Sequence, residues 1–190
     1  MKLQPLLFAI VMASCNLSAS IITYDASLNG SNESPSNGSP ATGLAEVTVD
    51  DSLNTMAVSI TFVGLAGPAT ASHIQCCTAA AFTGTAGVAA SFPTFPSLTS
   101  GTFTLTYDLT SLATYNPAFI TASGGTAADA EATLLAGLAG ELAYVNIHDS
   151  IYPGGEIRGF LAPAVPEPAT FGLTGLALVG LLALRSRIAA

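Results

Sequence analysis

Eight polar side chains in the middle of the chain are of the types that bind metals, transfer protons or form covalent bonds. They are His73, Gln75, Cys76, Cys77, Asn146, His148, Glu156 and Arg158. Residues two apart in a β-strand point to the same face, so His73 shares a face with Gln75, as Asn146 does with His148. If these two strands are neighbours, the chain's only two histidines converge.

Imidazole together with thiolate or carboxylate is a ligand set for copper or zinc. The residues of such a site would be His73, His148, Cys76 and Cys77. Their spacing matches no established metal motif, however, and a structural role fits the same residues. In that role the polar side chains hydrogen-bond the loops at one end of the domain, and Arg158 forms an ion pair with Glu156 or Asp149. Both interpretations stay open, and without the metal site no cofactor is expected.

The adjacent cysteines allow three states. An exported protein with two thiols usually pairs them, but Cα atoms across a trans peptide bond are only about 3.8 Å apart, less than most disulfides require. Cys76 and Cys77 could therefore form a disulfide with each other, bind a soft metal as thiols, or remain free or pair between molecules. A disulfide between these neighbours would be a rigid surface knob and a candidate redox element.

Motifs of the common catalytic classes are missing from the sequence. It has no nucleophile elbow around a serine, no His-Glu-x-x-His, no P-loop and no glycine-rich dinucleotide turn. Asp108, Asp129 and Glu131 lack the pattern of a glycosidase pair. We therefore expect a protein that is not an enzyme.

The elements that must position these residues are mostly strands. Apolar residues alternate with polar ones in five segments, which predicts half-buried strands. The segments are Ala45–Val49, Met56–Phe62, Phe103–Tyr107, Ala143–Ile147 and Ile157–Leu161. The Ala- and Leu-rich stretch Thr126–Leu138 predicts one short helix capped by Thr126, and Ser31–Ser39 predicts an exposed loop. Many short strands with one helix indicate an antiparallel β-sandwich or barrel.

The charge balance of the middle segment excludes one class of partner. Between residues 21 and 165 there are 11 acidic residues and one cation, Arg158, so the net charge is −10. Such a surface repels phosphate backbones, so nucleic acid is excluded as a partner. Acidic composition with abundant Ser, Thr, Asn and Gly is typical of a soluble exported protein, and attraction of divalent cations is the alternative explanation.

The N-terminal segment predicts export. Met1–Ser20 has a charged start at Lys2, a short apolar core over Leu6–Ala13 and small residues before the expected cleavage point. The apolar core is too short to span a bilayer. Met12–Cys15 loosely resembles a lipoprotein box, which leaves lipidation at Cys15 as the alternative.

The C-terminal segment carries the most specific signal. Val165-Pro166-Glu167-Pro168 precedes an apolar run, Ala169–Leu184, and then Arg185 and Arg187. A helix over 169–184 predicts a transmembrane segment with the arginines on the cytoplasmic side. An ordinary membrane anchor would share these features, but Val165–Ala190 resembles the PEP-CTERM sorting signal of Gram-negative bacteria that make exopolysaccharide. That resemblance implies recognition by an exosortase-type enzyme, removal of the tail and release to the outer surface or matrix.

Further segments resemble the CHRD domain, a module named from chordin. The residues that carry this resemblance are Ala26–Glu33, Ala41–Ala45, Gly64-Leu65, Ala69–Ile74, Tyr144–His148 and Tyr152–Gly159. The resemblance implies an immunoglobulin-like β-sandwich and no assigned reaction. The family usually has His-Ile-His where this chain has His73-Ile74-Gln75, and the missing imidazole weakens a metal site carried over from the family.

We therefore expect a signal peptide over 1–20, a CHRD-like β domain over 21–163 and a sorting tail over 164–190. The leading hypothesis is a non-catalytic protein of the cell surface or extracellular matrix, reached through an inner-membrane intermediate. Its expected partners are the exosortase, the membrane before processing, and exopolysaccharide or other matrix components. The alternative is a copper- or zinc-binding redox domain that uses His73 and His148.

Overall fold

The computed structural model describes residues 21–164, which form nine strands and two α-helices. The strands are β1 (Ile21–Asn29), β2 (Thr42–Asp50), β3 (Thr55–Val63), β4 (Ala69–Gln75), β5 (Val88–Ser91), β6 (Gly101–Asp108), β7 (Tyr144–Asp149), β8 (Ile157–Phe160) and β9 (Ala162–Pro163). The helices are α1 (Pro117–Ser123) and α2 (Ala127–Ala139), with 3₁₀ turns at η1 (Gly30–Asn32) and η2 (Leu112–Thr114).

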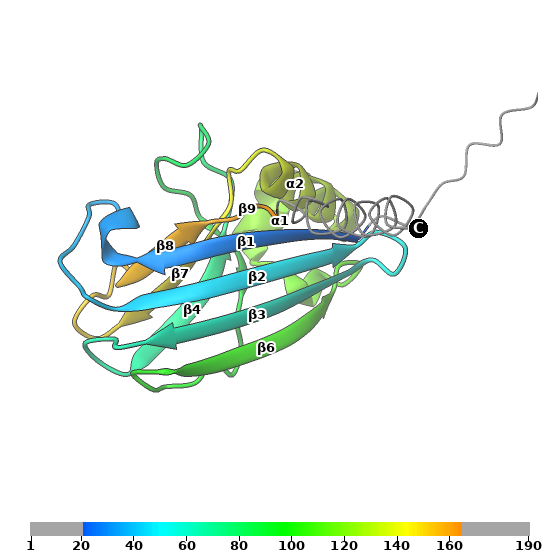
Figure 1. The fold of residues 1–190 in the computed structure, drawn as a ribbon. Helices are drawn as coiled ribbons and strands as arrows, with labels where there is room; N and C mark the ends of the chain where they lie inside the picture. Colours follow the sequence, from blue (N-terminus) through cyan, green and yellow to red (C-terminus); the bar gives the residue numbers. More distant parts are fainter. Residues whose placement is uncertain (1–20, 165–190) are drawn as a thin grey trace, which may run out of the picture.

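All strands belong to one antiparallel sheet in the order β5-β4-β7-β8-β1-β2-β3-β6, and β9 pairs with β1. The sheet curls into a half-barrel, so that β1, β2, β3 and β6 face β4, β7 and β8 across the core (Figure 1). The expected antiparallel β fold is confirmed. Its two facing layers are halves of one continuous sheet, because β1 pairs with β2 on one side and β8 on the other.

The alternating pattern places the core as expected. In β3 the side chains of Met56, Val58, Ile60 and Phe62 are buried while the residues between them are exposed or half-buried. The open edges of the half-barrel are bridged by an aromatic cluster that includes Phe92, Phe103 and Tyr107. The Tyr107 hydroxyl on β6 donates to the carbonyl of Ser91 on β5 at 2.6 Å. The same inner layer of side chains therefore joins both ends of the sheet.

The helix predicted over Thr126–Leu138 is present as α2. The Thr126 hydroxyl accepts from the backbone N–H of Asp129 at 3.1 Å, and Leu134 and Leu138 are buried in the core. The preceding helix α1 was not predicted. Its start follows a common rule, because Asn116 is the N-cap and Pro117 occupies the first helical position.

The predicted segments at both ends of the chain lie outside the described residues. These are the signal peptide, the sorting motif Val165–Pro168 with Arg185 and Arg187, and the transmembrane helix over 169–184. Within residues 21–164, none of the helices has the length and apolar character that crossing a membrane requires.

Candidate functional site

Strand register brings three of the eight polar candidates into one row across the sheet. Arg158 on β8 pairs with Asn146 on β7, which pairs with His73 on β4. The row continues to Asn29 on β1 and to Ser91 on β5. The strands that carry the two histidines are neighbours, because β4 pairs with β7.

Arg158 is the centre of this arrangement. Its side chain is only 4% exposed, which is unusual for a cation and requires compensating partners. The guanidinium donates through Nε to the carbonyl of Asn32 and through an Nη to the carbonyl of Gly84 at 3.0 Å. Its Nε lies 3.9 Å from Oε2 of Glu33. Arg158 therefore ties β8 to two loops that cover the outer face of the sheet.

Two aromatic rings complete the surroundings of Arg158. Its guanidinium carbon lies 4.8 Å from the ring centre of Tyr144 and 5.6 Å from that of Phe160. Both separations are within the range of a cation–π interaction, which strengthens when the cation is desolvated.

The predicted ion pair between Arg158 and Glu156 is wrong, because Arg158 pairs with Glu33 instead. Glu156 is fully buried and its Oε1 accepts from the Ser39 hydroxyl at 2.6 Å and from the N–H of Ala66 at 2.9 Å. The correct partner is far away in sequence and arrives through the turn η1, which follows the end of β1 opposite Arg158.

The expected exposed loop Ser31–Ser39 is therefore partly an internal element. Glu33 is only 9% exposed, and Asn37 donates through its amide to the carbonyl of Glu156 at 3.0 Å. The polar composition indicated a loop but concealed this burial. Charge balance indicated that the lone arginine pairs with a carboxylate, but it did not single out Glu33.

Burial raises the pKa of Glu33 to about 7, although nearby Arg158 opposes the shift. Glu33 Oε2 lies 3.5 Å from the side-chain nitrogen of Asn146, which is itself buried. Gly155 covers both groups closely, because a Cβ at that position would lie 2.6 Å from the Asn146 amide and 2.7 Å from Glu33 Oε1. The Glu33 carboxyl, with its pKa raised to about 7, thus lies directly beneath Gly155.

Two further carboxyl groups, those of Asp149 and Glu156, lie together where the loops at this end of the sheet meet. Burial raises the pKa of Glu156, and the adjacent Asp149 raises it further. Asp149 is also buried and accepts from the N–H groups of Gly67 at 2.6 Å and Ile151 at 2.9 Å. The Asp149 oxygens are therefore satisfied by backbone N–H groups, while the raised pKa of the neighbouring Glu156 favours its protonated form.

The two histidines converge as the strand pairing requires. Their ring centres are 5.2 Å apart and the planes meet at 68°. Burial lowers the pKa of His73 to about 4, with a contribution from His148, and burial also lowers the pKa of His148. Both imidazoles are therefore neutral at physiological pH.

The cysteines do not join the histidines. A disulfide bond links Cys76 to Cys77, and Cys76 is buried rather than displayed as a knob. The sulfurs rest against α2, since a Cβ at Gly137 would lie 2.2 Å from one and 2.4 Å from the other. Among residues 21–164, no three His, Cys, Asp or Glu side chains are grouped as a metal site would group them.

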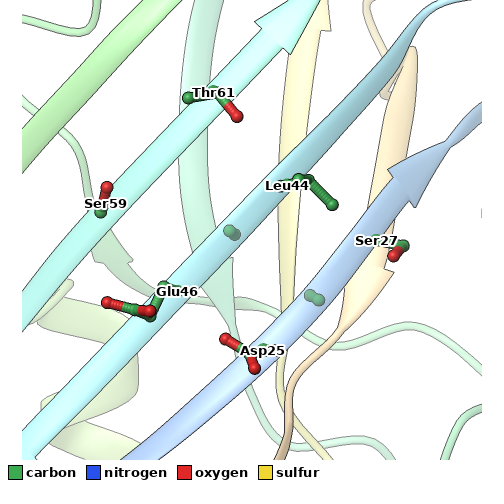
Figure 2. Close-up of a pocket in the computed structure, with 8 residues that line it drawn as sticks. Asp25, Ser27, Leu44, Glu46, Ser59 and Thr61 are labelled. Carbon is green, nitrogen blue, oxygen red and sulfur yellow. The ribbon is translucent and has the colours of Figure 1, made fainter. Parts of the chain in front are cut away.

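On the opposite half of the sheet, within residues 21–164, the outward side chains of β1, β2 and β3 are exposed or half-buried. A hollow of about 440 Å³ lies over these strands, and Figure 2 shows the residues that line it. The side chains labelled there are Asp25, Ser27, Leu44, Glu46, Ser59 and Thr61, all of them exposed. Because these are hydroxyl, carboxylate and one aliphatic group, the hollow can accept and donate hydrogen bonds.

Two family models match the chain. The CHRD domain matches residues 24–161, and the PEP-CTERM protein-sorting motif matches residues 164–188. No curated protein and no solved structure shows a significant match. The first match runs from Tyr24 within β1 to the residue after β8, and the second begins directly after β9.

Proposed function

We propose that this chain, which belongs to the CHRD domain family, is a non-catalytic protein of the cell surface or extracellular matrix. Its PEP-CTERM motif makes it an exported protein that is recognised by exosortase and processed at the membrane. The final location and the matrix role are our proposal, and we further propose that the domain contacts neutral exopolysaccharide.

The observation that carries this proposal is the regular hydroxyl-rich face of β1, β2, β3 and β6. Strand register aligns exposed or half-buried side chains in rows across these four strands. Three successive rows are Thr102–Thr61–Leu44–Ser27, Thr104–Ser59–Glu46–Asp25 and Thr106–Ala57–Thr48–Thr23. Same-face neighbours on adjacent strands are about 5 Å apart, so the hydroxyl groups form a dense array of donors and acceptors.

Charge argues for a neutral polymer. Asp25 and Glu46 lie in this face, whereas Arg158, the only Lys or Arg between residues 21 and 164, is buried in the other half of the sheet. An acidic polysaccharide would meet carboxylates without a compensating cation, which costs free energy. A neutral polyhydroxylated chain would exchange hydrogen bonds with water for hydrogen bonds with this face.

The sorting part of the proposal is tested by removing Phe171–Ala190. The domain should then accumulate in the periplasm instead of at the surface, because the apolar tail that presents the motif at the membrane is gone. Surface display that is unchanged by the deletion would overturn the assignment of the sorting role to this tail.

The contact face is tested by co-sedimentation of the exported protein with neutral exopolysaccharide from the producing cells. Replacing both Ser59 and Thr61 with lysine should abolish binding, because two hydroxyls are lost and bulky cations enter the hollow. Ala132→Lys, on an exposed position of α2, is the matched control and should bind like the unchanged protein. Equal binding by all three proteins would exclude this face, and stronger binding by the double variant would indicate an acidic polymer instead.

A further inference from the structure

We infer that His73 and His148 form a binding site for a d¹⁰ metal cation, Zn²⁺ or Cu⁺, on the outer face between β4 and β7. The site lies on the opposite half of the sheet from the proposed polysaccharide face and does not depend on it. Its ligands are the two imidazoles alone, with the cysteines excluded by their bond to each other.

The first support is the tautomer of His148. Its Nδ1 lies 3.1 Å from the carbonyl oxygen of Pro153, and a carbonyl can only accept, so Nδ1 carries the proton. Nε2 is then the nitrogen with the lone pair. A backbone carbonyl that fixes the ring in this way is the usual second partner of a metal-bound histidine.

The second support is that each ring has a buried nitrogen without a partner. Within residues 21–164, His73 Nδ1 and His148 Nε2 are two of only six buried side-chain nitrogen or oxygen atoms that make no hydrogen bond. An orphaned buried acceptor costs free energy, so two of them on adjacent strands call for a shared partner. A cation that accepts both lone pairs would satisfy both at once.

The third support is the separation of the rings. Imidazole nitrogen binds Zn²⁺ at about 2.0–2.1 Å and lies about 1.2 Å from its ring centre, so a tetrahedral angle at the cation separates two ring centres by about 5 Å. The observed separation is 5.2 Å. The separation of the two ring centres is therefore the one that a shared tetrahedral cation requires.

Two protein ligands leave coordination positions open. The two ligand nitrogens are themselves buried, so water or a small donor that completes the coordination would enter the site together with the cation. A tetrahedral cation with filled d orbitals fits this arrangement, because imidazole suits both zinc and copper and neither d¹⁰ ion imposes square-planar geometry.

The test uses the exported protein, stripped with a chelator and titrated with Zn²⁺ by calorimetry and with Cu⁺ under anaerobic conditions. We expect one cation per chain for at least one of the two metals. His73→Gln and His148→Gln should each weaken binding at least tenfold. The matched control, Asp25→Asn with Glu46→Gln, removes two exposed carboxylates of the other half and should leave the affinity unchanged.

Nitrogen chemical shifts of the unchanged protein keep the proposal testable if a histidine variant fails to fold. Addition of the bound metal should shift His73 Nδ1 and His148 Nε2 and leave the protonated His148 Nδ1 as an N–H. Absence of saturable binding, binding that survives both histidine substitutions, or binding that is lost in the carboxylate control would each overturn the site.

Discussion

The outer faces of the two halves of the curled sheet differ in solvent exposure. In β3, inward side chains are buried and outward ones are mostly exposed, so one face of the strand contacts the core and the other contacts solvent. In β7, five of six residues are buried, including the outward-facing Tyr144 and Asn146, because loops cover the outer face as well. Polar side chains are therefore surface groups on one half and internal, mutually bonded groups on the other.

This difference teaches that residue polarity alone does not reveal exposure in such a sheet. Ser59 and Thr61 need only water as a partner, so a change there should be felt locally. Arg158 and Glu33 lack that option: Arg158 depends on Glu33 and on loop carbonyls, and Glu33 depends on Arg158 and on the Asn146 amide. Substitutions of similar chemistry should thus have very different consequences in the two halves.

The largest expected effect comes from Arg158→Ala. The change leaves Glu33 buried without its cation and removes the ring contacts with Tyr144 and Phe160. The free energy of unfolding should therefore fall by about 3 kcal/mol or more. Chemical denaturation measures the loss, with Glu46→Ala on β2 as control at under about 0.5 kcal/mol. Similar losses for both variants would erase the distinction between the halves.

The pH dependence of stability should follow Glu33. Its pKa in the folded protein is about 7 against 4.5 for the free group, so folding favours the protonated form. This contribution is fully present below pH 4.5 and is lost as the pH rises through 7, by up to about 3 kcal/mol. The lowered pKa values of His73 and His148 act in the opposite direction, since their contribution is lost as the pH falls below 6.5.

The Glu33 contribution is isolated by comparing denaturation curves of the unchanged protein and Glu33→Gln from pH 4.5 to 8. The amide cannot ionise, so the variant should gain stability relative to the unchanged protein as the pH rises. A constant difference across this range would show that Glu33 does not titrate there.

A smaller effect is expected from Gly155→Ala. Gly155 has φ of +129° and a Cβ there would approach Asn146 and Glu33 within 2.7 Å, so the methyl group should cost about 1–3 kcal/mol. The adjacent Gly154 has open space around the same position, and Gly154→Ala should change stability by under about 0.5 kcal/mol. Thermal melts of both variants compare a backbone position that contacts Asn146 and Glu33 with a neighbouring position that does not.

The smallest effect is expected from Glu46→Gln on β2. Glu46 is directly opposite Asp25 across the β1–β2 ladder, and like charges in that position are destabilising. The amide should therefore raise stability slightly, by under about 1 kcal/mol, and added salt should remove the gain. A gain that persists at high salt would mean that repulsion between these carboxylates is not its cause.

The sequence predicted strand positions and inward faces well wherever one face of a strand is exposed to solvent. Alternation located β2, β3 and β6 and assigned their inward faces correctly, and Thr126 marked the start of α2. Strand β5 has only four residues, too few for a period to be visible. Convergence of the histidines was expected only if their strands were neighbours, and the pairing of β4 with β7 meets that condition.

The buried polar cluster of Arg158, Glu33 and Asn146 was only partly predictable. Arg158 was identified as structural, but its partner was sought in the nearest carboxylates, whereas Glu33 precedes it by 125 positions. Contacts of that kind depend on which strands pair, and local spacing does not contain this information. Burial of Glu33 under Gly155 was concealed for the same reason, since the segment around it has the composition of a loop.

The short strand β9 sets the direction in which the domain can be presented. β9 pairs with β1 at Tyr24 and Asp25, and the N–H of Ala164 donates to the carbonyl of Thr23 at 2.8 Å. The first and last described residues are therefore fastened together at one pole of the half-barrel. Asn29 and Arg158 meet toward the opposite pole, along with the loops around Asn37 and Gly155. If the chain is held through residues after Ala164, the pole that carries Asn29, Arg158 and these loops points away from the point of attachment.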